Sequence, residues 1–407
     1  MSQNQLIPHL FRTEYSKIVA VLCSVFGLNE IELAEDMVSE TFLIATETWG
    51  LKGVPDNPTA WLYTVAKNKT KDYFKHHKIF NEKVKPALQN ESLNVVFELD
   101  LSDKNITDSQ LRMLFAICNP ILKKETQIAL ALRILCGFGI DEIAQAFLTN
   151  KATINKRLQR GKAKLRLEKV DLLSSINNSI DDRLDTVLSV IYLLFNEGYY
   201  SVTSKKTIQK ELCIEAMRLT YMLLNYSRTN LPKTNALMAL LCFHSSRFDA
   251  RTSDTGELIL YANQNRDKWN YELIKKGAYF LNLSVDHTYS KYHYEAIISY
   301  WHTKEDDTAN KWESILQSYN QLLQISYSPA IALNRTYALS RANSKKEAIL
   351  EALKINLKEY HLYHMLLANL YETENKKKQL FHLKEAFLLA KTTNDRKLIQ
   401  QKIDAIK

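Results

Sequence analysis

The stretch GIDEIAQAFLTNKATINKRLQRGKAKLR, residues 139–166, predicts a helix, a tight turn and a second helix. In the second helix an i, i+4, i+7, i+11 spacing creates one small or apolar face, made of Ile154, Leu158, Gly161 and Leu165. From Lys151 to Lys169 eight Lys or Arg residues stand against one acid, Glu168. A short cationic helix that packs by a narrow stripe suits a DNA major groove, where phosphates supply affinity and base edges supply specificity. The alternative is a solvated basic surface helix; the helix–turn–helix spacing and the EIA motif before the turn favour DNA.

The composition of the whole chain predicts an all-α protein with more than one domain. The 407 residues contain only 9 Gly and 7 Pro, and long segments carry a helical period of hydrophobicity. The net charge of +9 permits a polyanionic partner without naming one. Five cysteines with no CxxC pair support neither a disulfide framework nor a zinc ribbon. No signal peptide or membrane-spanning apolar segment is evident, so we expect a cytoplasmic protein with no membrane partner.

The N-terminal part of the chain alternates between acidic and basic segments. From Asn29 to Gly50 there are six acids and no base, and on a helix Glu32, Asp36 and Glu40 would stack on one face while another face turns inward. This acidic ridge is either a dock for a basic partner or a solubilising surface. The inward stripe would comprise Ala34, Met37, Val38, Thr41 and Ala45.

The next segment reverses the charge. Asn57 is a predicted N-cap and Pro58 the first residue of a helix in which seven lysines between Lys67 and Lys85 accompany aromatic residues. Lysines beside aromatic rings suit single-stranded DNA, in which phosphates and unstacked bases are both accessible. Helical aromatics are also common in cores; we expect Trp61 to be core, and the pattern leaves both roles open for Tyr73 and Phe74.

An acidic helix, a basic aromatic helix, a linker and a helix–turn–helix, in that order, resemble the sigma-70 family of bacterial transcription initiation factors, and more closely the extracytoplasmic-function (ECF) type. AEDMVSETFLIATETW (34–49) is similar to the region 2 helix that contacts the β′ clamp of RNA polymerase. NPTAWLYTVAKNKTKDYFKHHK (57–78) is similar to the part that melts and reads the −10 element. The segment 111–166 resembles region 4, which reads the −35 element. Segments VIYLLFNEGYY (190–200) and ALLCFHSSRFDAR (239–251) resemble the C-terminal extension of an ECF subgroup with a TPR-like domain.

The resemblance implies a set of contact residues and partners. The partners would be promoter DNA and core RNA polymerase, through its β′ clamp and β flap. Polymerase contacts are expected from Asp36, Glu40 and Glu32, and DNA contacts from Lys67, Asn68, Lys71, Lys75, Lys151, Thr153, Lys156, Arg157, Arg160 and Lys164. Two positions depart from the pattern of relatives. Gly139 lacks the side-chain oxygen of a Ser or Thr N-cap, and Lys151 stands where an acid is common in the subgroup, so the subgroup's promoter sequence cannot be transferred.

The predicted domains are region 2 at 1–80, a linker at 81–106, region 4 at 107–170 and a C-terminal TPR-like regulatory domain at 183–407. The linker is either a segment that extends toward the polymerase active site, as the resemblance implies, or a tether that makes no contacts. In the last part, Leu333 and Leu367, and likewise Ala352 and Ala386, are 34 residues apart, which is the tetratricopeptide period. Such arrays bind a regulatory protein or peptide, or serve only as packing modules.

Three functions fit these patterns: a sigma factor, a helix–turn–helix regulator with a TPR-like sensor that acts without polymerase, and a TPR scaffold whose basic N-terminus binds nucleic acid nonspecifically. The acidic ridge favours the first, because the other two do not need it. No P-loop, GxGxxG, GxSxG or HEXXH motif occurs. We therefore expect no enzyme activity, no cofactor and no metal, and we interpret scattered histidines such as His293 as structural or exposed.

Overall fold

The computed structural model describes residues 3–84, 99–147, 149–170, 172, 180–200, 206–251, 259, 263–355, 357–390 and 393–406. Every regular element in these ranges is a helix, which confirms the all-α prediction. The chain forms two compact units, Met1–Thr229 and Asn230–Lys407. Residues 85–98 of the predicted linker, including Pro86, lie outside the described ranges.

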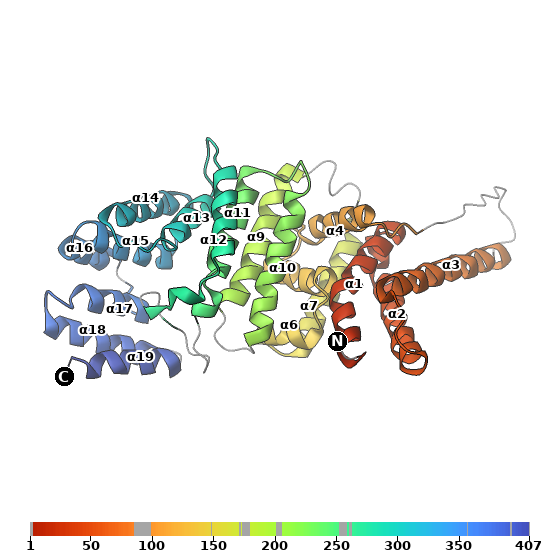
Figure 1. Ribbon diagram of the computed structural model, residues 1–407, viewed down its shortest axis with the longest axis horizontal. Coiled ribbons are helices and arrows are strands. Elements are labelled where there is room, and N and C mark those ends of the chain that lie inside the picture. Colours follow the sequence, from red (N-terminus) through yellow and green to blue (C-terminus); the bar gives the residue numbers. More distant parts are fainter. Residues whose placement is uncertain are drawn as a thin grey trace. The chain divides into compact units, whose positions relative to one another are not determined.

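The first unit contains two groups of helices joined by the linker (Figure 1). The group expected to be region 2 comprises α1 (Gln3–Phe26), η1 (Leu28–Glu30), α2 (Ile31–Lys52) and α3 (Pro58–Val84). The group expected to be region 4 comprises α4 (Asp103–Ile117), α5 (Lys124–Leu130), the π-helical turn η2 (Ala131–Leu135), α6 (Ile140–Ala146) and α7 (Lys151–Leu167). In the part of this unit that the structure describes, α9 (Ile180–Tyr200) and α10 (Lys206–Leu224) follow.

Helix α1 is shared by both groups, because it packs against α2 and α3 on one side and α4 and η2 on another. Its residues Tyr15, Ile18 and Leu22 are fully buried. The stripe expected on α2 is also buried, from Ala34 through Ala45. Burying both stripes removes a large apolar area from water, which is the main favourable contribution to folding.

The helices α9 and α10 form an antiparallel pair that packs on α4, α5 and α6. Arg218 of α10 donates a hydrogen bond to the carbonyl of Leu135 at 2.8 Å, and Glu211 lies 3.2 Å from Arg12 of α1. The compact unit therefore continues to Thr229. The C-terminal part expected at 183–407 contributes α9 and α10 to this unit, a packing that sequence patterning did not reveal.

The second unit is a succession of helices. Its longer elements are α11 (Pro232–Ser245), α12 (Tyr271–Leu283), α13 (Lys291–Trp301), α14 (Ala309–Ile325), α15 (Pro329–Ala342), α16 (Lys345–Ile355), α17 (His361–Leu370), α18 (Lys376–Leu389) and α19 (Thr393–Asp404), with short turns η3 (Phe248–Ala250) and η5 (Arg266–Lys268) between α11 and α12. Consecutive helices pack on one another, α14 on α15 and α17 on α18 among them.

The 34-residue period corresponds to two successive helix pairs, α15/α16 and α17/α18. Leu333 and Leu367 are buried on the first helix of each pair, and Ala352 and Ala386 are buried on the second. Residues 343–344 connect the helices of the first pair, and residues 371–375 connect those of the second. None of the described helices combines the length and apolar character needed to cross a bilayer.

Candidate nucleic-acid interface

The helix–turn–helix consists of α6 and α7 joined at residues 147–150. Asn150 caps α7, because its side chain accepts a hydrogen bond from the backbone N–H of Thr153 at 2.8 Å. The predicted face of Ile154, Leu158, Gly161 and Leu165 is buried. Gly161 lets α7 approach α5 closely: a Cβ at that position would lie 2.7 Å from a methyl of Thr126 and 3.0 Å from one of Leu130. The sequence periodicity thus identified the correct buried face of α7.

Glu142 compensates for the missing side chain of the Gly139 N-cap. Its carboxylate accepts a hydrogen bond from the backbone N–H of Gly139 at 2.7 Å, which is one half of a capping box. The same carboxylate lies 2.6 Å from the guanidinium of Arg12 on α1. The start of α6 is therefore fixed by an ion pair 130 residues away in sequence, which local reasoning could not reveal.

The candidate DNA contacts on α7 differ in accessibility. Lys156 and Arg160 are exposed, whereas Arg157 is half-buried with its guanidinium 5.4 Å from the centre of the Phe147 ring. Lys151 is exposed and lies 2.6 Å from Asp141 at the start of α6. Lys164 is engaged within its own group, where it donates to the carbonyl of Ile121 at 2.6 Å. The exposed cations Lys151, Lys156 and Arg160 lie within the first ten residues of α7, toward the end with which such helices read base edges.

Helix α3 begins at Pro58 with Asn57 as its N-cap, as predicted, and the Asn57 side chain accepts from the Ala60 N–H at 3.0 Å. Trp61 lies half-buried against the buried Trp49, with ring centres 5.3 Å apart, which agrees with its expected core role. Tyr73 and Phe74 are half-buried, and both rings lie within 6 Å of the Phe26 ring, at 5.6 and 5.4 Å. These two aromatics therefore pack on the end of α1.

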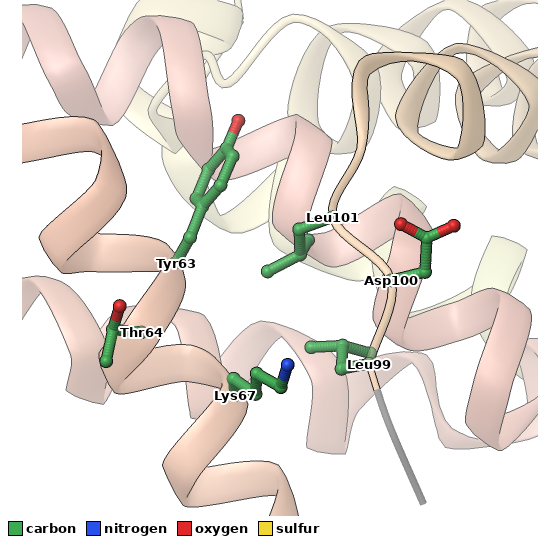
Figure 2. Close-up of a pocket in the computed structure, with 6 residues that line it drawn as sticks. All are labelled: Tyr63, Thr64, Lys67, Leu99, Asp100 and Leu101. Atoms are coloured by element: carbon green, nitrogen blue, oxygen red, sulfur yellow. The ribbon is translucent and has the colours of Figure 1, made fainter.

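The DNA candidates on α3 lie on its polar side. Asn68, Lys71 and Lys75 are exposed, while Lys67 is half-buried. Figure 2 shows why: Lys67, with Tyr63 and Thr64, faces the segment that precedes α4 across a hollow of about 500 Å³. The facing residues are Leu99, Asp100 and Leu101.

Two ionisable groups define the chemistry of this hollow. The pKa of Asp100 is lowered, first by the backbone N–H of Ser102 and, more weakly, by the charge of Lys67. Burial raises the pKa of the Tyr63 phenol, whose hydroxyl donates to Glu14 at 2.6 Å. The end of the linker thus places a carboxylate beside one of the lysines expected to contact DNA.

The acidic ridge of α2 has the predicted exposure. Glu32, Asp36 and Glu40 are all exposed, one above the next along the helix. Glu40 lies 2.5 Å from Lys69 of α3, and Glu32 lies 2.9 Å from Arg166 of α7. Two of the three predicted polymerase contacts are therefore engaged by cations of this chain's own DNA-facing helices.

Sequence reasoning missed Glu35, which it counted only among six acids. Glu35 is 7% exposed, and its carboxylate is paired with Lys162 of α7 and with Arg133 of η2. Its position between Ala34 and Asp36 indicated partial burial, because an acid at the border of an apolar stripe is partly buried when the helix packs.

His293 and the cysteines have structural surroundings. His293 caps α13, where its ring accepts from the Ser290 N–H at 3.0 Å and its other nitrogen lies 2.9 Å from the Ser284 carbonyl. All five cysteines are buried, and burial raises the pKa of the Cys242 thiol to about 12. Among the described residues no cluster of His, Cys, Asp and Glu has the arrangement of a metal site.

The geometry defines a class of protein: a helical DNA-binding protein with a helix–turn–helix and a second basic helix beside an acidic one. Comparison with known families gives three matches along the chain. Sigma-70 region 2 matches residues 10–79, sigma-70 region 4 matches residues 121–165, and a family of unknown function (DUF6596) matches residues 183–285.

A similar protein of Rhizobium meliloti (strain 1021), described as uncharacterized protein R00370, is 31% identical over 353 residues, which cover 84% of this chain and 82% of that protein. No solved structure matches the chain. The chain belongs to the sigma-70 family, as an ECF-like sigma factor with a helical C-terminal extension. Its role is promoter recognition, and its family consists of transcription regulators.

Proposed function

We propose that this protein binds core RNA polymerase through the acidic ridge of α2 and directs it to promoters, with α3 at the −10 element and α7 at the −35 element. The observation that carries the proposal is the arrangement of charge. Asp36 is exposed on α2, beside the basic α3, while Lys156 and Arg160 are exposed on α7. A protein that only bound DNA would have no need of an exposed acidic ridge next to its cationic helices, since the ridge repels phosphate.

The exposure of the side chains indicates which residues contact bases and which contact phosphates. Arg160 is the candidate for base readout, because an exposed arginine can reach the two acceptors of a guanine edge. Lys71 and Lys75 are candidates for phosphates of the melted strand, where they would add affinity without sequence preference. Lys67, Asn68, Lys151, Thr153, Lys156, Arg157 and Lys164 complete the proposed interface.

For the second unit we propose regulation by a protein or peptide. Helices α14, α15 and α16 line a hollow of about 590 Å³ with a polar wall. Arg335 lies there, 2.9 Å from the Asn320 side chain and 3.5 Å from Glu351. A groove of paired polar groups over stacked helices suits an extended peptide, which offers both charges and backbone groups.

The proposal is tested with Asp36→Lys combined with Glu40→Lys. Reversing Glu40 removes only an exposed ion pair, worth at most about 1 kcal/mol, so the fold is retained. We expect the double variant to keep its helical content, lose co-purification with core polymerase, and give no run-off transcript from a promoter of the neighbouring operon.

The matched control is Asp56→Lys, which reverses an exposed acid in the loop between α2 and α3, outside the ridge. It should bind polymerase as the unaltered chain does. Undiminished co-purification of the double variant would remove the basis for a polymerase subunit and favour the regulator that acts without polymerase.

A further inference from the structure

One side of α7 faces away from the helices on which it packs. The buried stripe from Ile154 to Leu165 holds α7 against α5 and α6. Because successive residues of an α-helix are rotated by about 100°, the sequence also identifies the residues on the opposite side. All of them are exposed, and together they form the outer face of α7: Ala152, Asn155, Lys156, Gln159, Arg160 and Ala163.

The polar side chains of the outer face make no hydrogen bond or ion pair within the part of the chain that the structure describes. Other cations of α7 are engaged by acids of this chain. Lys151 lies 2.6 Å from Asp141, and Arg166 lies 2.9 Å from Glu32. The hydrogen-bonding groups of the outer face are therefore available to a ligand.

Two side chains of the outer face, those of Asn155 and Gln159, are uncharged amides. They are four residues apart, so they lie on adjacent turns, about 6 Å apart along the helix axis. An amide presents a donor and an acceptor in one plane, which matches the N6 donor and N7 acceptor of an adenine edge in the major groove. An uncharged amide gains little from the phosphate charge that attracts cations. Both amides are therefore better suited to bases than to the DNA backbone.

The neighbours of the two amides favour close approach to a groove. Lys156 and Arg160 place positive charge beside them, which attracts the phosphates on both sides of the groove. Ala152 and Ala163, toward the two ends of the outer face, are small and do not hold the helix away from base edges. The amides are thus flanked by affinity and are not hidden behind longer side chains.

We propose that Asn155 and Gln159 determine the base preference of this protein at the −35 element, and that each binds N6 and N7 of one adenine. This inference rests on the proposed function and names the bases that α7 recognises. A separation of about 6 Å along the helix corresponds to about two base-pair steps of about 3.4 Å. The −35 element therefore carries two adenines, on either strand, within about two steps of each other.

The base preference is tested with the full chain, alone and bound to core polymerase, and a pool of duplexes whose −35 segment is randomised. Sequencing of the bound fraction should show adenine enriched at two positions about two base-pair steps apart or closer. Asn155→Ala and Gln159→Ala should each lose the preference for adenine at one position and keep it at the other. Both variants keep the helix, because alanine is a stronger helix former than either amide.

A modified base tests the contact itself, since 7-deazaadenine pairs with thymine but lacks the N7 acceptor. Gln159→Ala should weaken binding to the enriched duplex about 5- to 150-fold, the value of one bidentate base contact. Placed where Gln159→Ala loses its preference, the modified base should weaken binding of the unaltered chain about 2- to 12-fold, the value of one hydrogen bond. Gln159→Ala should bind the modified and unmodified duplexes equally.

The matched control is Gln145→Ala, which removes an exposed amide from the neighbouring helix α6. It should retain both adenine preferences and the sensitivity to the modified base. Adenine preferences that survive Asn155→Ala and Gln159→Ala, or an enriched sequence that lacks the two adenines, overturn the assignment. Discrimination against the modified base that persists in Gln159→Ala overturns the contact. If no sequence is enriched, with or without polymerase, the proposed function fails and this inference fails with it.

Discussion

Replacing Gly161 by valine tests whether close contact between α7 and α5 fixes the reading helix. A Cβ alone would lie 2.7 Å from the Thr126 methyl, well inside normal contact, and valine adds two further methyls. Overpacking of this kind costs about 1–3 kcal/mol. The helix propensity of valine exceeds that of glycine by about 0.3–0.5 kcal/mol and offsets part of the cost. We therefore expect a net local destabilisation of about 0.5–2.7 kcal/mol.

The matched control is Gly50→Val, because a Cβ at Gly50 has no atom within 4 Å. The same substitution there should be neutral or slightly stabilising. The assay is hydrogen exchange of the full chain, read on peptides from α5 and α7, since a chain with two units does not unfold in one step. Exchange from α7 should accelerate about 2- to 100-fold in Gly161→Val. Equal protection of α7 in the two variants would refute the packing argument.

Three further predictions follow from the described contacts. Arg160→Ala should weaken binding to a specific −35 duplex by about 1–3 kcal/mol and binding to a scrambled duplex much less. Lys71→Ala should weaken binding to both duplexes alike and reduce the salt dependence of binding. Equal losses of affinity for both duplexes in Arg160→Ala would show that Arg160 contacts only the DNA phosphate backbone. A fragment truncated after Thr229 should be soluble, whereas a fragment truncated after Asp182 should aggregate, because it lacks α9 and α10, which cover α4, α5 and α6. Equal solubility of the two fragments in a sedimentation assay would contradict this. Burial, then the charges of its neighbours, lowers the pKa of His382 from 6.5 to about 4. The stability that neutral His382 contributes is therefore present above pH 6.5 and is lost as the pH falls toward 4. The loss of exchange protection in α18 at acid pH should be smaller in His382→Gln, and an identical pH profile would exclude this histidine as its source.

The expectation for the truncation differs from what sequence patterning indicated. The predicted start of the C-terminal domain at residue 183 implied that a fragment ending at Asp182 would be soluble. In the structure Arg218 and Glu211 of α10 bind groups of the region 4 and region 2 helices, and the buried face of α9 includes Leu188 and Ile191. The fragment that preserves these contacts ends at Thr229.

The helices, their buried faces and the family were all predictable from local patterns in the chain. The stripe from Ile154 to Leu165, the Asn57 cap and the 34-residue pairs all arise from contacts within a few turns of helix, or from repetition of one local unit, so periodicity exposes them. The same holds for the exposed ridge of Asp36, whose charges need only face water.

Contacts between residues far apart in the chain could not be predicted from such patterns. Glu35 and Lys162 are 127 residues apart, and Arg12 and Glu142 are 130 apart, so nothing in their local patterns distinguishes them from other charges on the same helices. The partner of a charged side chain depends on how whole helices pack, and packing is settled by the summed burial of both apolar faces. The packing that buries both apolar faces places Glu35 inside the unit and leaves Asp36, the next residue, exposed to water.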